Sequence, residues 1–356
     1  MDKILLTTGG TGGHIFPALA VAEELRRCKP DARLLFVGSE YGPEAKLCAR
    51  AGVDFAGLPV RGFLGRGFRA LGAAARMGVA VGRALALVRG FGPDAVAGFG
   101  GYAAFAPMLA ARMLGVPALL HEQNAVAGTS NRVLSRLARK VCISLPGTRG
   151  FPSEKCVLTG NPVRAAIARV AKQRQDGRGT RRLLVLGGSQ GAHSLNALMP
   201  GLLARLRAEG VEIRHQSGEK DLAATRAAYA NAGYAPECVG AFIDDMAEAY
   251  AWADLALCRA GASTVAELCA AGLPSVLVPF PAAIHDHQTR NAEVVAAAGA
   301  ARMVQERDFA RTDMGELLGG LLRDTDELGA MGLAARSLAR PDAAGAVADA
   351  LEAVAR

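Results

Sequence analysis

The stretch KILLTTGGTGGH, residues 3–14, decides the fold. Residues 3–7 form a short apolar run, typical of a strand that is buried in a parallel sheet. Thr8–His14 follows directly, and a helical Ala/Leu pattern comes after it. A glycine-rich turn between a strand and a helix presents backbone N–H groups and the positive end of the helix to an anion. The segment has no Gly-Lys-Ser/Thr, and Ile15 stands where a dinucleotide fingerprint needs its third glycine, so it predicts a phosphate site of another type.

The same pattern recurs twice. A strand at Leu183–Leu186 runs into GGSQGA at residues 187–192, and GFGGY at residues 98–102 precedes a helix at Ala103–Leu114. Tight backbone packing is the alternative explanation for each loop taken alone. Three such loops, two of which open the two halves of the chain, favour phosphate or pyrophosphate binding.

Alternating apolar runs and helical patterns predict an α/β protein with parallel sheets. The polar stretch 171–180 reads as a linker between two Rossmann-like domains, 1–164 and 165–340, with a cleft between them for a ligand. A last helix is predicted from Pro341 to the C-terminus. The predicted strands are Lys3–Thr7, Arg33–Val37, Ala95–Gly98, Ala118–His121, Lys140–Ile143, Arg182–Leu186, Glu212–His215, Leu255–Cys258 and Ser275–Val278.

Composition excludes several classes of protein. Hydrophobic residues make up 51% of the 356 residues and charged residues 21%, a globular balance. The seven cysteines are scattered without a C-x-x-C, which argues against a disulfide framework or a zinc site and predicts reduced thiols in a cytosol. The N-terminus lacks the pattern of a signal peptide, and the apolar stretch Gly98–Leu120 carries two prolines and Arg112, so we expect core and no transmembrane helix.

Charge is unevenly distributed. Residues 1–164 hold 21 Lys and Arg against 10 Asp and Glu, whereas residues 165–356 hold 20 against 23. Segment 61–89 has no acid, and its basic residues include Arg66, Arg69, Arg76 and Arg83. With nearby Phe and Leu residues, it predicts docking to an anionic membrane surface, and a solvated arginine face is the alternative. Nucleic-acid binding is disfavoured, because aromatic residues are only 5% and no recognition motif occurs.

A fourth loop, Cys258–Leu268, follows another predicted strand. Its small residues at 260–263 leave the first turn of the next helix open to a diphosphate without a metal. Glu267 could accept two hydroxyls of a ribose, or it could simply be a favourable charge near a helix N-terminus.

Eight motifs together resemble one family. They occur in the order seen in the UDP-N-acetylglucosamine (UDP-GlcNAc) transferases of peptidoglycan synthesis, in glycosyltransferase family 28, and the match covers nearly the whole chain. The motifs are Thr8–His14, Gly98–Tyr102, His121–Asn124, Gly160–Arg164, Gly187–Gly191, Phe242–Met246, Arg259–Glu267 and Asp286–Ala292.

The resemblance implies a GT-B fold whose C-terminal helix, 341–356, packs back on the first domain. It implies an inverting transfer of GlcNAc from UDP-GlcNAc to the C4 hydroxyl of the muramoyl sugar in undecaprenyl-pyrophosphoryl-MurNAc-pentapeptide (lipid I). The first domain would bind the acceptor and the membrane, and the second UDP-GlcNAc. The expected location is the cytoplasmic face of the bacterial inner membrane, with cell-wall synthesis proteins as partners.

Site residues follow from the same resemblance. Ile243 would read the uracil through its backbone, Glu267 would hold the ribose, and Gln288 and Asn124 would contact the GlcNAc. The phosphates of UDP would be held by Ser189, Ala262, Ser263, Thr264 and Val265, and Ala266 would also belong to the UDP-GlcNAc site. Thr11, Gly12, Gly13 and Arg164 would line the cleft, and the acceptor's pyrophosphate would be received by Gly12, Gly13, His14, Gly100, Gly101 and Tyr102. The sequence departs from the family pattern at Ala282 and His285, in the segment before Gln288.

Inversion needs a base for the acceptor's proton and stabilisation of the departing UDP. His14 is the first candidate base, because it ends the phosphate loop and titrates near neutrality; shaping the loop is its alternative role. Glu122 is the second candidate, with a buried pairing to an arginine as the alternative. Arg259, Arg164 and the helix after Gly261 could stabilise UDP.

We expect no metal and no other cofactor, because the only Asp-x-Asp pair, Asp324–Asp326, lies far from these loops. Three other classes stay open at this stage: a UDP-sugar epimerase, a GT-B transferase with another acceptor, and a sugar-nucleotide sensor without activity.

Overall fold

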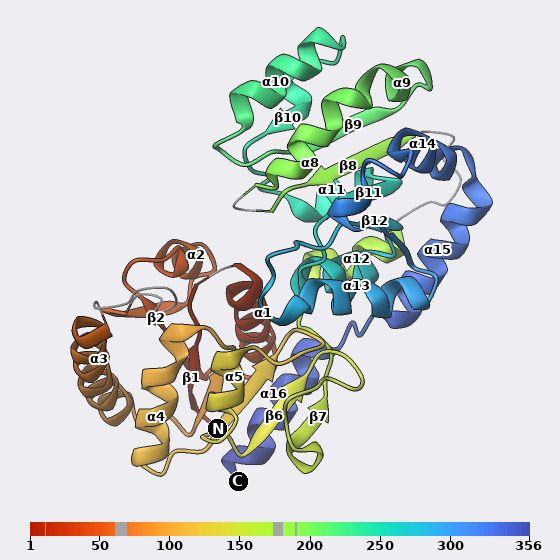
Figure 1. The fold of residues 1–356 in the computed structure, drawn as a ribbon. Coiled ribbons are helices and arrows are strands. Elements are labelled where there is room, and N and C mark those ends of the chain that lie inside the picture. The colour runs from red at the N-terminus through yellow and green to blue at the C-terminus, as the bar shows by residue number, and fades with distance from the viewer. Residues whose placement is uncertain (11, 61–69, 174–180, 189–190) are drawn as a thin grey trace. The chain divides into compact units, whose positions relative to one another are not determined.

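A computed structural model describes residues 1–10, 12–60, 70–173, 181–188 and 191–356. The chain divides into two compact units, shown in Figure 1. Unit 1 consists of Met1–Arg164 and Arg340–Arg356, and unit 2 consists of Ala165–Ala339.

Unit 1 is built on a parallel sheet of seven strands in the order β3-β2-β1-β4-β5-β6-β7. The chain order reverses between β1 and β4, which makes the carboxyl ends of these two strands the topological switch point, where open α/β sheets bind their ligands. The strands are β1 (Lys3–Thr7), β2 (Arg33–Ser39), β3 (Asp54–Leu58), β4 (Ala95–Gly98), β5 (Ala118–Glu122), β6 (Lys140–Ile143) and β7 (Cys156–Leu158).

Helices cover both faces of this sheet. Leu5 packs with residues of α3 and α4, whereas its neighbours Ile4 and Leu6 pack with α1 and α16, as the alternation of side chains along a strand requires. The helices of unit 1 are α1 (Gly12–Cys28), α2 (Glu44–Arg50), α3 (Ala70–Phe91), α4 (Phe105–Met113), α5 (Thr129–Leu134) and α16 (Ala343–Ala355).

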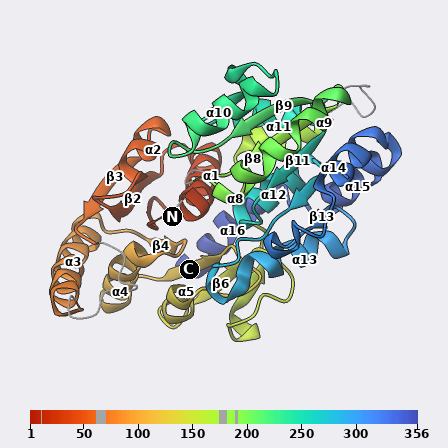
Figure 2. The ribbon, with the colours of Figure 1, turned by 45° about the horizontal axis from the view of Figure 1, so that its top comes forward.

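The C-terminal helix α16 belongs to the core of unit 1. It lies beside α1 and against β4, β5 and β6, as Figures 1 and 2 show. Val347 and Leu351 are fully buried in the same cluster as Ile4 and Leu6. The last helix therefore completes one face of the sheet formed by the first part of the chain.

Unit 2 repeats the arrangement with a parallel sheet of six strands, β10-β9-β8-β11-β12-β13. Its switch point lies between β8 and β11. The strands are β8 (Arg182–Leu186), β9 (Glu212–Gln216), β10 (Val239–Gly240), β11 (Leu255–Cys258), β12 (Ser275–Leu277) and β13 (Ala301–Met303). The helices are α6 (Ala165–Ala168), α7 (Val170–Gln173), α8 (His193–Leu198), α9 (Leu203–Ala208), α10 (Leu222–Asn231), α11 (Met246–Trp252), α12 (Ala262–Ala271), α13 (His287–Ala297), α14 (Met314–Arg323) and α15 (Thr325–Leu338).

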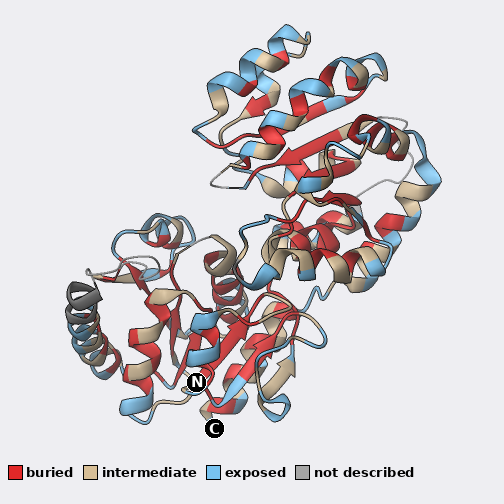
Figure 3. Cartoon of the chain, viewed as in Figure 1, coloured by how far each residue is buried: buried red, intermediate tan, exposed pale blue. Residues whose placement is uncertain are grey.

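The predicted α/β class with two Rossmann-like halves is confirmed. Every predicted strand is present within two residues of its expected bounds. The sequence reading missed β3, β7, β10 and β13, and the segment predicted as a linker begins inside α7. Figure 3 shows the strands of both sheets buried beneath partly exposed helices.

Candidate active site

Two glycine loops meet at the switch point of unit 1, one after β1 and one after β4. The Thr8 hydroxyl donates a hydrogen bond to the carbonyl oxygen of Gly100 at 3.0 Å. Gly101 has a φ of +77°, and a Cβ at this position would lie 1.9 Å from the carbonyl oxygen of Gly9. The packing explanation therefore holds at Gly101, because no other residue lets the two backbones approach so closely.

A carboxylate that the sequence reading missed also contacts this loop. Glu44, in the first turn of α2, is fully buried, and its Oε1 accepts a hydrogen bond from the Gly10 N–H at 3.1 Å. The Gly10 N–H is thus not available to an anion. The part of the loop suited to an anion is the start of α1, whose first turn carries no acidic residue. Only the fold brings Glu44 to a loop 34 residues earlier.

His14 lies in the first turn of α1, and its Nδ1 is 2.9 Å from Oε1 of Gln123. The Arg164 guanidinium carbon lies 4.6 Å from the centre of the Phe16 ring, on the same helix. A cationic and a titratable side chain thus stand at the start of α1 beside Gly12 and Gly13. Thr11 lies outside the described residues. The Tyr102 ring lies close to the loop after β1, because a Cβ on Gly10 would be 3.7 Å from the Tyr102 ring.

The structure argues against Glu122 as a base. Its side chain is 1% exposed, and its carboxylate accepts hydrogen bonds from the backbone N–H groups of Asn124 and Gly128 and from the side-chain amides of Asn124 and Asn131, at 2.9–3.1 Å. Among the described residues, the partners of this carboxylate are amides, and no pairing with an arginine is seen. A carboxylate whose lone pairs hold a loop in place is poorly placed to take a proton from a substrate. Asn124 is held by the same contacts.

In unit 2, helix α12 begins directly after β11 and the segment Arg259–Gly261. Gly261 at the N-cap makes no side-chain cap, and the first turn contains no acid. Ala262, Ser263 and Thr264 are partly exposed in this turn. Backbone N–H groups at such a helix end, with the dipole behind them, suit a phosphate.

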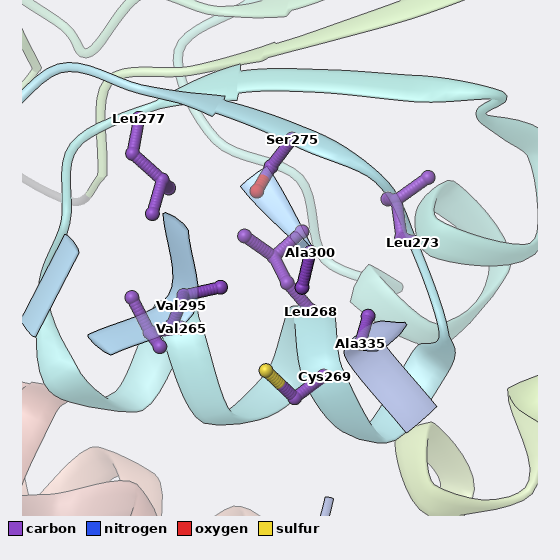
Figure 4. Close-up of a pocket in the computed structure, with 9 residues that line it drawn as sticks. All are labelled: Val265, Leu268, Cys269, Leu273, Ser275, Leu277, Val295, Ala300 and Ala335. Carbon is purple, nitrogen blue, oxygen red and sulfur yellow. The ribbon is translucent and has the colours of Figure 1, made fainter. Parts of the chain in front are cut away.

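The buried face of α12 is closely packed. Figure 4 shows Val265, Leu268 and Cys269 on the helix, with Leu277 and Val295 among the residues around them. The space that these residues enclose is too small for a water molecule. Burial raises the pKa of the Cys269 thiol to about 12, so it is a packing group. The N-terminal end of α12 is therefore held in a fixed position.

Glu267 occupies the second turn of α12 and is 8% exposed. Its Oε2 accepts a hydrogen bond from the Tyr250 hydroxyl at 2.9 Å. The carboxylate is therefore oriented by a partner on α11, which the sequence reading did not identify. A carboxylate held in this way fits the role of a ribose acceptor better than the alternative role, that of a solvated charge near a helix end.

Arg259 is already engaged within unit 2. Its guanidinium donates to the Ser194 hydroxyl at 2.7 Å and to the carbonyl oxygens of Val278 and Pro279, and it pairs with Glu306 at 2.7 Å. These contacts tie the loop after β11 to α8 and to the segment after β13. The structure thus gives Arg259 a bracing role within unit 2.

Other residues predicted to contact UDP-GlcNAc lie in unit 2 outside α12. The Gln288 side chain, on α13, accepts a hydrogen bond through Oε1 from the Phe280 N–H at 3.0 Å. Ile243 is partly exposed in the segment after β10. His285 and the next residue, Asp286, have positive φ values of 54° and 52°, so the segment that departs from the family pattern has an unusual backbone just before α13. Ser189 lies outside the described residues.

Within the described parts of the chain, no group of three or more His, Cys, Asp or Glu residues could hold a metal ion. Asp324, from the only Asp-x-Asp pair, caps α15 by accepting the Glu327 N–H at 2.9 Å. None of the helices in the described ranges is both long and apolar enough to cross a bilayer.

Two of the four predicted membrane arginines can be located. Arg76 and Arg83 are exposed on α3, with exposed Val79 on the same stripe. Arg83 also pairs with Glu40 at 3.0 Å, an exposed contact of small energetic value. Arg66 and Arg69 lie outside the described residues.

Comparisons with known proteins agree with this architecture. Residues 4–143 match the glycosyltransferase family 28 N-terminal domain, and residues 182–347 match the C-terminal domain of the same family. A relative from Nitratidesulfovibrio vulgaris (strain DP4), named UDP-N-acetylglucosamine–N-acetylmuramyl-(pentapeptide) pyrophosphoryl-undecaprenol N-acetylglucosamine transferase, is 56% identical over 99% of this chain and 97% of its own. A relative of the same name from Lawsonia intracellularis is 46% identical over 98% of this chain and 96% of its own.

Solved structures give the same result. The crystal structure of Acinetobacter baumannii MurG has a TM-score of 0.77 and 36% identity, covering 99% of this chain and 100% of that one. A putative UDP-N-acetylglucosamine 2-epimerase from Listeria monocytogenes has a TM-score of 0.71 at 14% identity, over 99% of this chain and 96% of that one, which shows a shared fold alone. On the two domain matches and these relatives, the chain belongs to glycosyltransferase family 28 and has the GT-B fold.

Proposed function

We propose that this protein transfers GlcNAc from UDP-GlcNAc to the C4 hydroxyl of MurNAc in undecaprenyl-pyrophosphoryl-MurNAc-pentapeptide, with inversion. Family membership and the shared name of its relatives support the reaction. The observation that carries the mechanism is the position of His14, in the first turn of the helix that leaves the switch point of unit 1, with only Nδ1 engaged among the described residues.

The donor site is assigned to unit 2. The diphosphate of UDP is assigned to the N-terminus of α12, at Ala262–Ala266, because this helix has a glycine N-cap and no acid in its first turn. Glu267, held by Tyr250, accepts the ribose hydroxyls. The charge that develops on UDP as it leaves is stabilised by the same helix end, so the transfer requires no metal. Ile243 and Gln288, also in unit 2, are assigned to the uracil and the sugar, as the family resemblance implies.

The acceptor site is assigned to unit 1. Its pyrophosphate lies at the start of α1, at Gly12–His14, and beside Gly100–Tyr102, with Arg164 as the nearby cation. In the displacement, the C4 oxygen forms a bond to the anomeric carbon while the bond from that carbon to the β-phosphate oxygen breaks. His14 Nε2 takes the hydroxyl proton, and the electron pair of the broken bond leaves with UDP.

Because the proposed acceptor is a membrane lipid, the protein must bind to a membrane surface, and α3 is the candidate helix for this contact. Exposed Arg76, Val79 and Arg83 form a basic and partly apolar stripe on it. Beside this helix a hollow of about 610 Å³ is lined by basic Lys3, Arg33 and Arg83 and by apolar residues such as Leu35, Leu87 and Phe91. We propose peripheral binding to the anionic cytoplasmic face of the inner membrane, next to other cell-wall synthesis proteins.

Transfer of radiolabelled GlcNAc from UDP-GlcNAc to a lipid I analogue, with EDTA present, tests the function. We expect robust transfer by the wild type and a loss of roughly 10²- to 10⁴-fold in kcat for His14→Ala, the usual contribution of a general base. His193→Ala is the matched control, because His193 is 85% exposed and pairs with Asp221 in unit 2. Tight UDP-GlcNAc binding without any transfer would sink the lipid I assignment, and a fully active His14→Ala would sink the base.

A further inference from the structure

His14 is the end of a chain of hydrogen bonds that runs through the core of unit 1. Its Nδ1 lies 2.9 Å from Gln123 Oε1. Gln123 Nε2 in turn lies 2.9 Å from the carbonyl oxygen of Phe99 and 3.2 Å from His121 Nδ1. His121 Nε2 lies 3.0 Å from the carbonyl oxygen of Gly160. Gln123 and His121 are 2% and 0% exposed, so water does not compete for these bonds.

Two backbone carbonyls fix the direction of every bond in this chain. A carbonyl oxygen can only accept, so the group of Gln123 that faces Phe99 must be the NH₂, and the ring nitrogen of His121 that faces Gly160 must carry a proton. The Gln123 oxygen then points at His14. His121 Nδ1 is left without a proton and accepts from the second hydrogen of the Gln123 amide.

The chain also depends on His121 staying neutral. A protonated His121 would turn Nδ1 into a second donor, opposed to the Gln123 amide. Burial, with a smaller contribution from the nearby His14, lowers the pKa of His121 to about 4, although the hydrogen bond to Gly160 acts in the opposite direction. Its ring also packs against Phe99, with the ring centres 5.6 Å apart. His121 is therefore a fixed acceptor at neutral pH.

The consequence reaches His14. Gln123 Oε1 accepts only, so His14 Nδ1 must carry the proton, and in the neutral ring the lone pair is then on Nε2. We propose that Gln123, oriented by the Phe99 carbonyl and by His121, is a positioning residue that holds the His14 proton on Nδ1 and leaves Nε2 free to accept a proton from the substrate. This inference rests on the proposed role of His14 as the base.

The arrangement suits a base that is used in every turnover. When Nε2 gains a proton, Nδ1–H still donates to Gln123, so the ring keeps its orientation in both states. A neutral amide achieves this without the negative charge that a carboxylate partner would place beside the acceptor's pyrophosphate.

Nitrogen-15 spectra of the full chain, labelled in histidine, test the proposal at about pH 8.5, where an unperturbed imidazole is neutral. The His14 signals are identified by their absence in His14→Ala. We expect a proton on Nδ1 and none on Nε2 in the wild type. In Gln123→Met, a side chain of similar length without an acceptor, we expect the proton to move in part to Nε2.

Kinetics on the same variant separate positioning from folding. For Gln123→Met we expect kcat to fall roughly 10- to 100-fold, less than on loss of the base itself, with KM for UDP-GlcNAc within about twofold of wild type. Gln123→Asn, whose shorter amide cannot reach both Phe99 and His14, should behave likewise and serves if the Met variant does not fold. Tyr229→Phe is the matched control, because it removes a 2.9 Å hydrogen bond to another buried histidine, His215, and should leave the His14 spectrum unchanged.

A wild-type His14 with its proton on Nε2, or a Gln123→Met variant with an unchanged His14 spectrum and unchanged kcat, would overturn the proposal. Failure of the proposed function gives a different result. If His14→Ala keeps full transfer while the spectra change as expected, the base assignment fails and the positioning by Gln123 stands.

Discussion

The first six strands of unit 1 have the same order as the six strands of unit 2, but the two units use their switch points differently. In unit 1, two glycine loops pack against each other and against Glu44, and His14, the proposed base, is hydrogen-bonded to the neutral side chain of Gln123. In unit 2, the N-cap of α12 is a glycine without a capping side chain, and Arg259, just before the helix, pairs with Glu306. Under the proposed function, the same fold supplies a site for proton transfer in one unit and a site for an anionic leaving group in the other.

This difference follows from which backbone N–H groups are already used. The Gly10 N–H is taken by a carboxylate, whereas the N-cap of α12 is Gly261, which offers no side-chain acceptor to the first turn. A loop whose backbone N–H groups are hydrogen-bonded within the protein is rigid. A helix N-terminus whose N–H groups lack such partners attracts an anion. The predictions that follow test this contrast.

The largest effect is expected for Gly101→Ala in unit 1. Alanine is strained at a φ of +77°, and its Cβ would overlap the Gly9 carbonyl oxygen, so the free energy of unfolding should fall by about 3–5 kcal/mol. Denaturant unfolding measures this change. The matched control is Gly82→Ala on α3, where nothing lies within 4 Å and a gain of about 0.5–1 kcal/mol is expected. An equal, small effect at both sites would show that the two loops do not need their close contact.

Acid should destabilise both units through one buried histidine in each. Burial lowers the pKa of His121 and of His215 to about 4, whereas an unfolded histidine titrates near 6.5. The unfolded chain therefore binds more protons, and stability is lost as the pH falls from about 6.5 to about 4, by about 2–3 kcal/mol for each histidine.

Unfolding measured across this pH range should be clearly less acid-sensitive in His215→Gln than in the wild type. Because His121 remains, part of the dependence should survive. An unchanged slope would mean that His215 does not stay neutral in the folded unit 2.

Glu267→Gln should weaken UDP binding about tenfold, because a charged acceptor for the ribose hydroxyls is replaced by a neutral one. The Gln oxygen can still accept from Tyr250, so stability should change by less than about 1 kcal/mol. Calorimetric titration with UDP measures the affinity. Glu44→Gln replaces a buried carboxylate of unit 1 and is the control, with UDP affinity unchanged. A loss of affinity in both variants would contradict the assignment of the donor to unit 2.

The smallest effect is expected at Gly188 in the loop after β8. Its φ is +73°, but a Cβ would meet nothing within 4 Å, so Gly188→Ala should cost only about 1 kcal/mol. Gly191→Ala in the same loop is the comparison, since its Cβ would lie 2.5 Å from the Ser217 carbonyl oxygen. Thermal unfolding that ranks the two variants in the reverse order would show that this loop is packed differently from its counterpart in unit 1.

The strands that the sequence reading found and those that it missed differ in position. The missed strands β3, β7, β10 and β13 are the outermost strands of the two sheets. An edge strand has one neighbour and is only partly buried, so its residues lack the continuous apolar run of a central strand. Asp54–Leu58, for example, has a single buried residue, whereas all four residues of Ala95–Gly98 are buried.

The sequence by itself determined the local features: central strands, glycine turns, the uncapped start of α12 and the position of His14 after its loop. Each of these depends on residues a few positions apart, and strand and helix periodicity records them directly. The family motifs added the reaction and the candidate ligand contacts.

Only the tertiary structure decided which partners those residues have. Gln123 reaches His14 across 109 residues of sequence, Glu44 reaches Gly10 across 34, and Tyr250 reaches Glu267 from a neighbouring helix. The tertiary structure also shows that Glu122, a candidate base, is a buried acceptor of hydrogen bonds from a loop, and that Arg259 is part of an ion pair. Such contacts are made when parallel strands bring their carboxyl ends to one edge of a sheet, and no local pattern specifies which side chains meet there.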